Sequence, residues 1–96
     1  MENDIIEAID MMKVLIVRYS AGERVIEPHA FGLGTSGNLL LRAYQREGAS
    51  ESGAKEGWKL FKTDEFYSLE ITDEDFTVRA GYKSGDKALS VVRKEI

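Results

Sequence analysis

Short segments of strand-forming residues, each followed by turn-forming residues, constrain the fold of this chain more than any other feature. The first segment, Lys13–Tyr19 (KVLIVRY), is dense in β-branched residues and almost continuously apolar, which favours a strand buried on both sides. Four further strands are predicted: Glu23–Leu33, Asn38–Gln45, Trp58–Lys62 and Phe66–Ile71. Of these strands, Asn38–Gln45 is expected to be the most central. Strands this short predict a mainly β protein, a small barrel of five to six strands.

The connections between these segments support the same fold. Pro28 lies inside a strand and cannot donate to a sheet ladder, so it marks an edge, a bulge or a bend. Residues Gly32–Gly37 contain three glycines and predict a turn. A phosphate-binding glycine loop would need a helix after it, but the next segment is strand-like. Residues Glu47–Gly57 are rich in glycine and serine and predict a polar hairpin loop.

The two ends of the chain lie outside these strands. Asp4–Met12 has apolar residues at helical spacing and a pattern resembling a capping box, Asp4 with Glu7, so we expect a short helix that docks its apolar stripe. Thr72–Asp75 predicts a helical turn or loop. The C-terminal tail has two possible structures, a helix over Lys87–Lys94 or a final strand, and the strand is favoured.

Length and composition indicate one domain of residues 1–96, with a helix at 4–12, a barrel at 13–71 and a C-terminal extension at 72–96. The chain has no cysteine, which excludes disulfides and thiolate metal sites and suits a cytoplasmic location. Its acidic N-terminus is not that of a signal peptide, and its apolar runs are too short to span a membrane. We therefore expect a soluble protein without a membrane partner.

Charge is distributed unevenly along the chain. The net charge is −4, which argues against a basic surface over the whole protein. Residues 13–62 nevertheless hold eight bases against five acids, a balance of +3, whereas both flanking regions are acidic. An anionic partner would therefore have to meet the middle of the chain. The alternative is that these charges are solvated strand faces.

No catalytic constellation is present. His29 is the only histidine, so a histidine metal site would have to be shared between subunits. No serine lies in a nucleophile-elbow pattern, and the adjacent Asp64 and Glu65 would face opposite sides of a strand. We therefore expect a protein that is not an enzyme and that carries no metal or cofactor.

Cationic and hydrogen-bonding side chains are spaced along the central strands and predict a ligand-binding face. Phe61 and Phe66 are expected in the core, whereas Tyr44 and Trp58 could be stacking surfaces. Arg42 interrupts an apolar strand and therefore needs a partner, either an internal carboxylate such as Glu27 or Asp64 or an anionic ligand. The complete set of predicted ligand-binding residues is Arg24, His29, Arg42, Tyr44, Gln45, Trp58, Lys59 and Lys62.

Three motifs in this order resemble the WYL domain family. They are Arg24–His29 (RVIEPH), the strand from Gly37 to Tyr44, and Lys59–Phe66 (KLFKTDEF), and the resemblance covers residues 5–71. The Trp-Tyr-Leu signature falls on Leu39–Leu41, of which only the leucine is kept. Lys59 and Lys62 stand where the family has arginine, which keeps the charge without the bidentate fork, and Glu65 reverses a positive charge.

The resemblance implies an SH3-like (Sm-like) barrel that senses nucleotides or single-stranded nucleic acid through a basic patch. Such domains are usually attached to a helix-turn-helix in transcriptional regulators, so this chain would be a stand-alone member. We expect a ligand-sensing or regulatory module in which Arg24, Arg42, Lys59 and Lys62 neutralise phosphate while the other predicted residues stack or hydrogen-bond. The alternative is an interaction module that forms a homodimer or binds a partner protein, through an edge strand or the apolar helix stripe.

Overall fold

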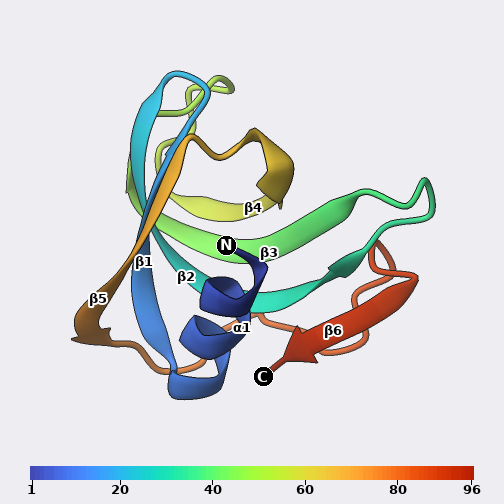
Figure 1. Ribbon diagram of the computed structural model, residues 1–96. Coiled ribbons are helices and arrows are strands. Elements are labelled where there is room, and N and C mark those ends of the chain that lie inside the picture. Colours follow the sequence, from blue (N-terminus) through green and yellow to red (C-terminus); the bar gives the residue numbers. More distant parts are fainter.

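The protein consists of one short helix and a single antiparallel sheet of six strands (Figure 1). The computed structural model describes all 96 residues. Neighbouring strands follow the order β4-β3-β2-β1-β5, and β6 pairs with β2. The elements in chain order are α1 (Glu2–Met11), β1 (Lys13–Tyr19), β2 (Gly22–Leu33), β3 (Leu39–Gly48), β4 (Gly57–Lys62), the 3-10 turn η1 (Thr63–Glu65), β5 (Ser68–Asp75) and β6 (Val91–Glu95).

Strand β2 is the centre of the sheet. One of its edges pairs with β3 along nearly its whole length, and the other pairs first with β1, up to Ile26, and then with β6, from Ala30. The central position was expected for the segment Asn38–Gln45. This segment forms β3, which pairs only with β2 and β4. The register with β3 shifts between Pro28 and Ala30, which confirms the irregularity expected at Pro28 and leaves His29 without a strand partner.

The mainly β class is confirmed, but the sheet is not closed into a barrel. It curves strongly, so that α1 lies against its concave side (Figure 1). The two outer strands, β4 and β5, are joined directly through η1 yet do not pair with each other. Each outer strand therefore keeps one edge without a strand partner.

Helix α1 packs its apolar stripe onto the sheet, as expected. Ile5, Ala8 and Ile9 are buried in the main core cluster, and the predicted core residues Phe61 and Phe66 belong to the same cluster. We call the sheet surface that carries this cluster the helix face. The helix spans residues 2–11 rather than 4–12 and has no side-chain cap, so the expected capping box is not formed. Its stability comes from packing rather than from capping.

The C-terminal region differs from expectation in one place. Thr72–Asp75 continues strand β5 rather than forming a turn, and the Thr72 hydroxyl donates to the carbonyl of Val14 on β1 at 2.7 Å. The favoured final strand is confirmed as β6. Residues 76–90 cross the sheet surface opposite α1, where Leu89 packs with Ala30 and Leu40, and we call this surface the loop face. No helix in the structure is long and apolar enough to span a membrane.

Candidate anion-binding pocket

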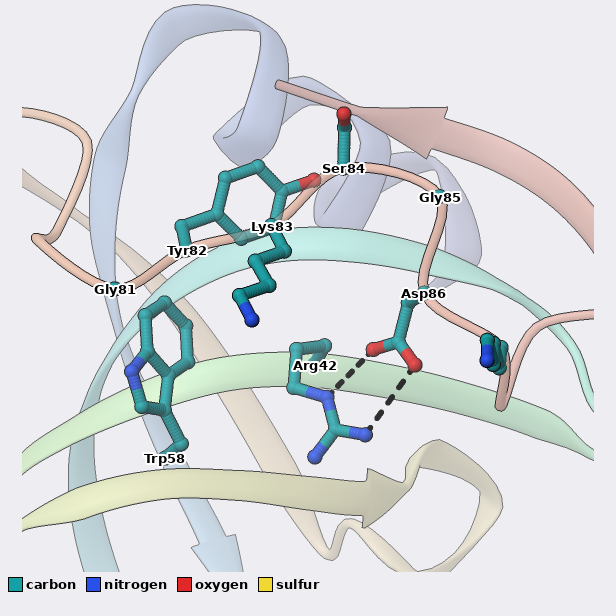
Figure 2. Close-up of a pocket in the computed structure, with 9 residues that line it drawn as sticks. Arg42, Trp58, Gly81, Tyr82, Lys83, Ser84, Gly85 and Asp86 are labelled. Atoms are coloured by element: carbon teal, nitrogen blue, oxygen red, sulfur yellow. Dashed lines mark hydrogen bonds and ion pairs between the residues drawn. The ribbon is translucent and has the colours of Figure 1, made fainter.

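A pocket of about 450 Å³ lies on the loop face, between the strands β3 and β4 and the loop Gly81–Lys87 (Figure 2). We call it the Arg42 pocket. Two of the predicted ligand-binding residues, Arg42 and Trp58, contribute to its wall. The full lining is Arg42, Trp58, Gly81, Tyr82, Lys83, Ser84, Gly85, Asp86 and Lys87.

Strand pairing places the two predicted residues in the same wall. Arg42 is paired with Leu60, and Tyr44, two residues further along β3, is paired with Trp58. Paired residues in an antiparallel sheet share a face, and residues two apart on a strand do so as well. The loop opposite them turns at Gly81 and Gly85, whose φ angles of 92° and 72° favour glycine. Its path brings the loop side chains over the strand side chains.

Arg42 forms an ion pair with Asp86 across the pocket. Its Nε donates to Oδ2 at 2.6 Å and its Nη2 donates to Oδ1 at 3.4 Å. The hydrogen bond from Arg42 lowers the pKa of Asp86, and the N–H of Ala88 also donates to this carboxylate. The internal partner of Arg42 is thus neither Glu27 nor Asp64 but an acid from the loop that crosses the sheet. Asp86 holds the loop against β3 and leaves Nη1 of Arg42 without a protein partner.

The pocket carries excess positive charge. Arg42, Lys83 and Lys87 are its cations and Asp86 is its only acid, which gives a balance of +2 in a chain of net charge −4. Lys83 and Lys87 are exposed and form no ion pair or hydrogen bond. Figure 2 shows the Lys83 amino group directed into the space between Trp58 and Arg42. These two amino groups can therefore bind an anion without breaking a contact within the protein.

Aromatic rings form the other wall. The rings of Trp58 and Tyr82 lie 6.0 Å apart at an interplanar angle of 32°. His29 packs behind both, at 4.8 Å from Trp58 and 5.0 Å from Tyr82, and also contacts Phe76. His29 is fully buried, and burial lowers its pKa, so it is a neutral packing group rather than a ligand contact.

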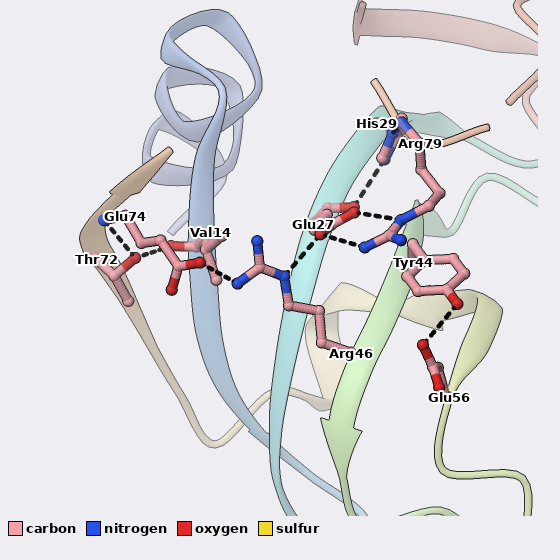
Figure 3. Close-up of polar contacts among 9 residues, drawn as sticks. All are labelled: Val14, Glu27, His29, Tyr44, Arg46, Glu56, Thr72, Glu74 and Arg79. Carbon is pink, nitrogen blue, oxygen red and sulfur yellow. Dashed lines mark hydrogen bonds and ion pairs between the residues drawn. The ribbon is translucent and has the colours of Figure 1, made fainter. Parts of the chain in front are cut away.

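An ion network centred on the buried Glu27 lies next to His29 and supports this wall (Figure 3). Glu27 is 2% exposed and accepts hydrogen bonds from Arg46 at 2.7 Å and from Arg79 at 3.1 and 2.8 Å. Burial alone would raise the pKa of Glu27, but the hydrogen bonds from Arg79 and Arg46 lower it. The Arg79 guanidinium also lies 4.1 Å from the ring centre of Tyr44, whose hydroxyl donates to Glu56. Tyr44 is therefore occupied by contacts within the protein.

The remaining predicted residues do not line the Arg42 pocket. Lys62 is paired with Leu40 and lies on the loop face, exposed beyond the pocket. Arg24, Gln45 and Lys59 lie on the helix face. Gln45 and Lys59 are paired with core residues of the neighbouring strands, and the Arg24 guanidinium lies over the ring of the core residue Phe61. The four cations expected to neutralise phosphate together are thus divided between two faces of the sheet.

The loop Gly81–Lys87 was not among the predicted ligand-binding residues. Its sequence, GYKSGDK, contains turn-forming residues together with an aromatic residue and two lysines. That combination is a signal for a ligand-contacting loop. Its position opposite Arg42 depends on contacts between residues distant in the chain, which the local pattern does not specify.

Comparison with known proteins assigns no family to this chain. No protein-family model matches the sequence, and no solved structure matches the fold.

Proposed function

We propose that the protein is a non-enzymatic ligand-sensing or regulatory module that binds a nucleotide, free or within single-stranded nucleic acid, in the Arg42 pocket. The observation that carries this proposal is the combination of two unpaired lysines and the half-buried ring of Trp58 in one pocket. Lys83 and Lys87 would neutralise phosphate, with the free Nη1 of Arg42 as a further donor. Trp58 would stack on the base, since every base presents a π-face to an aromatic ring.

The resemblance to the WYL family supports the same ligand class. We propose that the curved sheet is an open variant of the SH3-like barrel, because β1 to β4 follow one another as antiparallel neighbours. The basic contacts would differ from those of the family, since the cations of the Arg42 pocket come largely from the loop after β5. A chain without cysteine suits the cytoplasmic location that we propose for it.

The fluorescence of Trp58, the only tryptophan, provides the test. Titration with nucleoside monophosphates and with a short labelled single-stranded oligonucleotide should quench it in the wild-type protein. Replacing both Lys83 and Lys87 by Met should weaken binding strongly, whereas Lys55→Met, which removes an exposed lysine outside the pocket, should not. For an oligonucleotide held by two or three phosphate contacts, log K should fall with log salt with a slope of about −1.4 to −2. Absence of quenching by every probe would reject the proposal.

A protein-interaction function is the second candidate. It is favoured by the unpaired edges of β4 and β5 and by the exposure of Tyr67, which is 81% accessible. The apolar stripe of α1 does not serve this role, because Ile5 and Ile9 are buried in the core of the same chain. Light scattering over a range of concentrations would detect self-association, and Tyr67→Ser should reduce it if this surface is used. A monomer at all concentrations would exclude a homodimer.

A further inference from the structure

Arg24 is a buried cation without an anionic partner. It is 4% exposed and is the only arginine or lysine among the buried residues. Its Nη2 donates to the carbonyl of Ser20 at 2.7 Å, its guanidinium lies 4.9 Å from the ring centre of Tyr19, and its Nε has no hydrogen-bond partner. By contrast, the buried anion Glu27 has two arginines. The Arg24 guanidinium also lies 5.6 Å from the ring centre of Phe61, but a buried charge without a counter-charge is costly.

Gln45 supplies a complementary unsatisfied group at the same end of the helix face. It is fully buried, and its Nε2 donates to the carbonyls of Ala49 and Lys55, but its Oε1 accepts no hydrogen bond. Ala49 connects the two residues, since its own N–H donates to the carbonyl of Glu23, next to Arg24. One free donor and one free acceptor are therefore buried on the same face beside the same loop.

The loop of residues 49–56, whose Ala49 and Lys55 carbonyls accept from Gln45, joins β3 to β4 at the end of the sheet away from α1 (Figure 1). Lys59 holds it from the same face, because Nζ donates to the carbonyl of Ala54 and to the hydroxyls of Ser50 and Ser52. Lys59 has no carboxylate partner either. Glu51 accepts a hydrogen bond from the Ser20 hydroxyl and forms no ion pair with Arg24. Residues 51–56 are all exposed, so only polar contacts would have to exchange for the loop to move.

We propose that Arg24, Gln45 and Lys59 form a second anion site, specific for a protonated phosphate group and separate from the Arg42 pocket. The phosphate oxygens accept from Nε of Arg24 and from Lys59, which releases the loop hydroxyls. The P–OH group donates to Oε1 of Gln45. Water at the unpaired groups would leave the guanidinium charge uncompensated. Sulfate, which carries no proton near neutral pH, offers the charge without the donor.

The experiment follows two side-chain signals by NMR, the Arg24 Nε–H and the Gln45 amide, during titration with inorganic phosphate at pH 6.5. Both signals should shift and saturate. Sulfate at equal ionic strength should bind at least about tenfold more weakly, as expected for the loss of one hydrogen bond to a charged group. Equal responses to both anions would overturn the proposed specificity, and unchanged Arg24 and Gln45 signals would overturn the site itself.

Matched variants isolate the second site. Arg24→Met should reduce the increase in thermal midpoint that phosphate gives to the wild-type protein, whereas Arg18→Met, which removes an exposed arginine of β1 outside both sites, should keep it. The opposite pattern, or an undiminished increase in Arg24→Met, would contradict the proposal. Should Arg24→Met fail to fold, Gln45→Met provides the same test through the Arg24 Nε–H signal, whose response to phosphate should weaken about tenfold. The site stands or falls independently of nucleotide binding in the Arg42 pocket, because Trp58 lies on the other face.

Discussion

The backbone N–H of Arg79 donates a hydrogen bond of 3.1 Å to Nε2 of His29, which lies fifty residues earlier in the chain. On the other side of the ring, Nδ1 lies 2.8 Å from the carbonyl of Glu27 and must donate to it. The imidazole therefore carries its proton on Nδ1 and is neutral. It joins the bulge of β2 to the segment that crosses the loop face, and this joint supports the aromatic wall of the Arg42 pocket.

The state of His29 predicts a pH dependence of stability. Burial lowers the pKa of His29 in the folded protein, so the unfolded chain binds a proton more readily. Stability should be constant above about pH 6.5 and should fall below it, by at most about 1.4 kcal/mol per pH unit. Urea unfolding between pH 5.5 and 7.5 measures the effect. His29→Gln should remove the slope whatever its stability at pH 7.5, and an unchanged slope would show that another group is responsible.

Glu27 should be the most sensitive charged position. Glu27→Gln would remove the buried charge that accepts from the partly exposed Arg46 and Arg79, and we expect a loss of about 1.5–3 kcal/mol in the free energy of unfolding. The control is Asp10→Asn, which breaks an exposed pair with Lys94 and should cost less than about 1 kcal/mol. Chemical denaturation of both variants gives the comparison. Similar losses in the two would show that the Glu27 network contributes no more than a surface pair.

The docking of α1 predicts a contrast between neighbouring helix positions. Ile9 is 2% exposed, and Ile9→Ala should lower the free energy of unfolding by about 2–5 kcal/mol through lost burial and a residual cavity. Met11 is 55% exposed, and Met11→Ala should change it by less than about 0.5 kcal/mol. Equilibrium unfolding in urea distinguishes the two. A small effect at Ile9 would mean that the helix is not part of the cooperative unit.

Strand β6 depends on the absence of a side chain at Gly32. A Cβ at this position would lie 2.1 Å from the carbonyl oxygen of Val91, so Gly32→Ala should displace β6 and increase hydrogen exchange over residues 91–95. Gly37→Ala is the matched control, because its Cβ would meet no atom within 4 Å and only its φ of 83° introduces strain. That variant should lose about 1 kcal/mol and keep the protection of β6. Equal exchange in both variants would contradict the close approach at Gly32.

Most of the fold follows from local sequence patterns. Strand β1 has the bounds that its β-branched run predicts, and Pro28 marks the bulge in β2. The alternation of side chains along a strand also implies that Trp58 and Lys59 face opposite sides, which already divides the predicted ligand-binding set. Local patterns do not show that β4 and β5 fail to pair, since closure depends on the curvature of the whole sheet. Nor do they place Asp86 beside Arg42, which requires a contact across 44 residues.

The open sheet has a consequence for the behaviour of the protein at high concentration. The charged residues of outer strand β4 are both lysines, Lys59 and Lys62, whereas those of β5 are all acids: Glu70, Asp73, Glu74 and Asp75. Two copies that met through the same strand would place like charges opposite each other, which opposes sheet extension. This repulsion is screened within about 3 Å at 1 M salt, compared with about 10 Å at 0.1 M. Pairing of β4 with β4, or of β5 with β5, between two copies should therefore become less unfavourable as ionic strength rises.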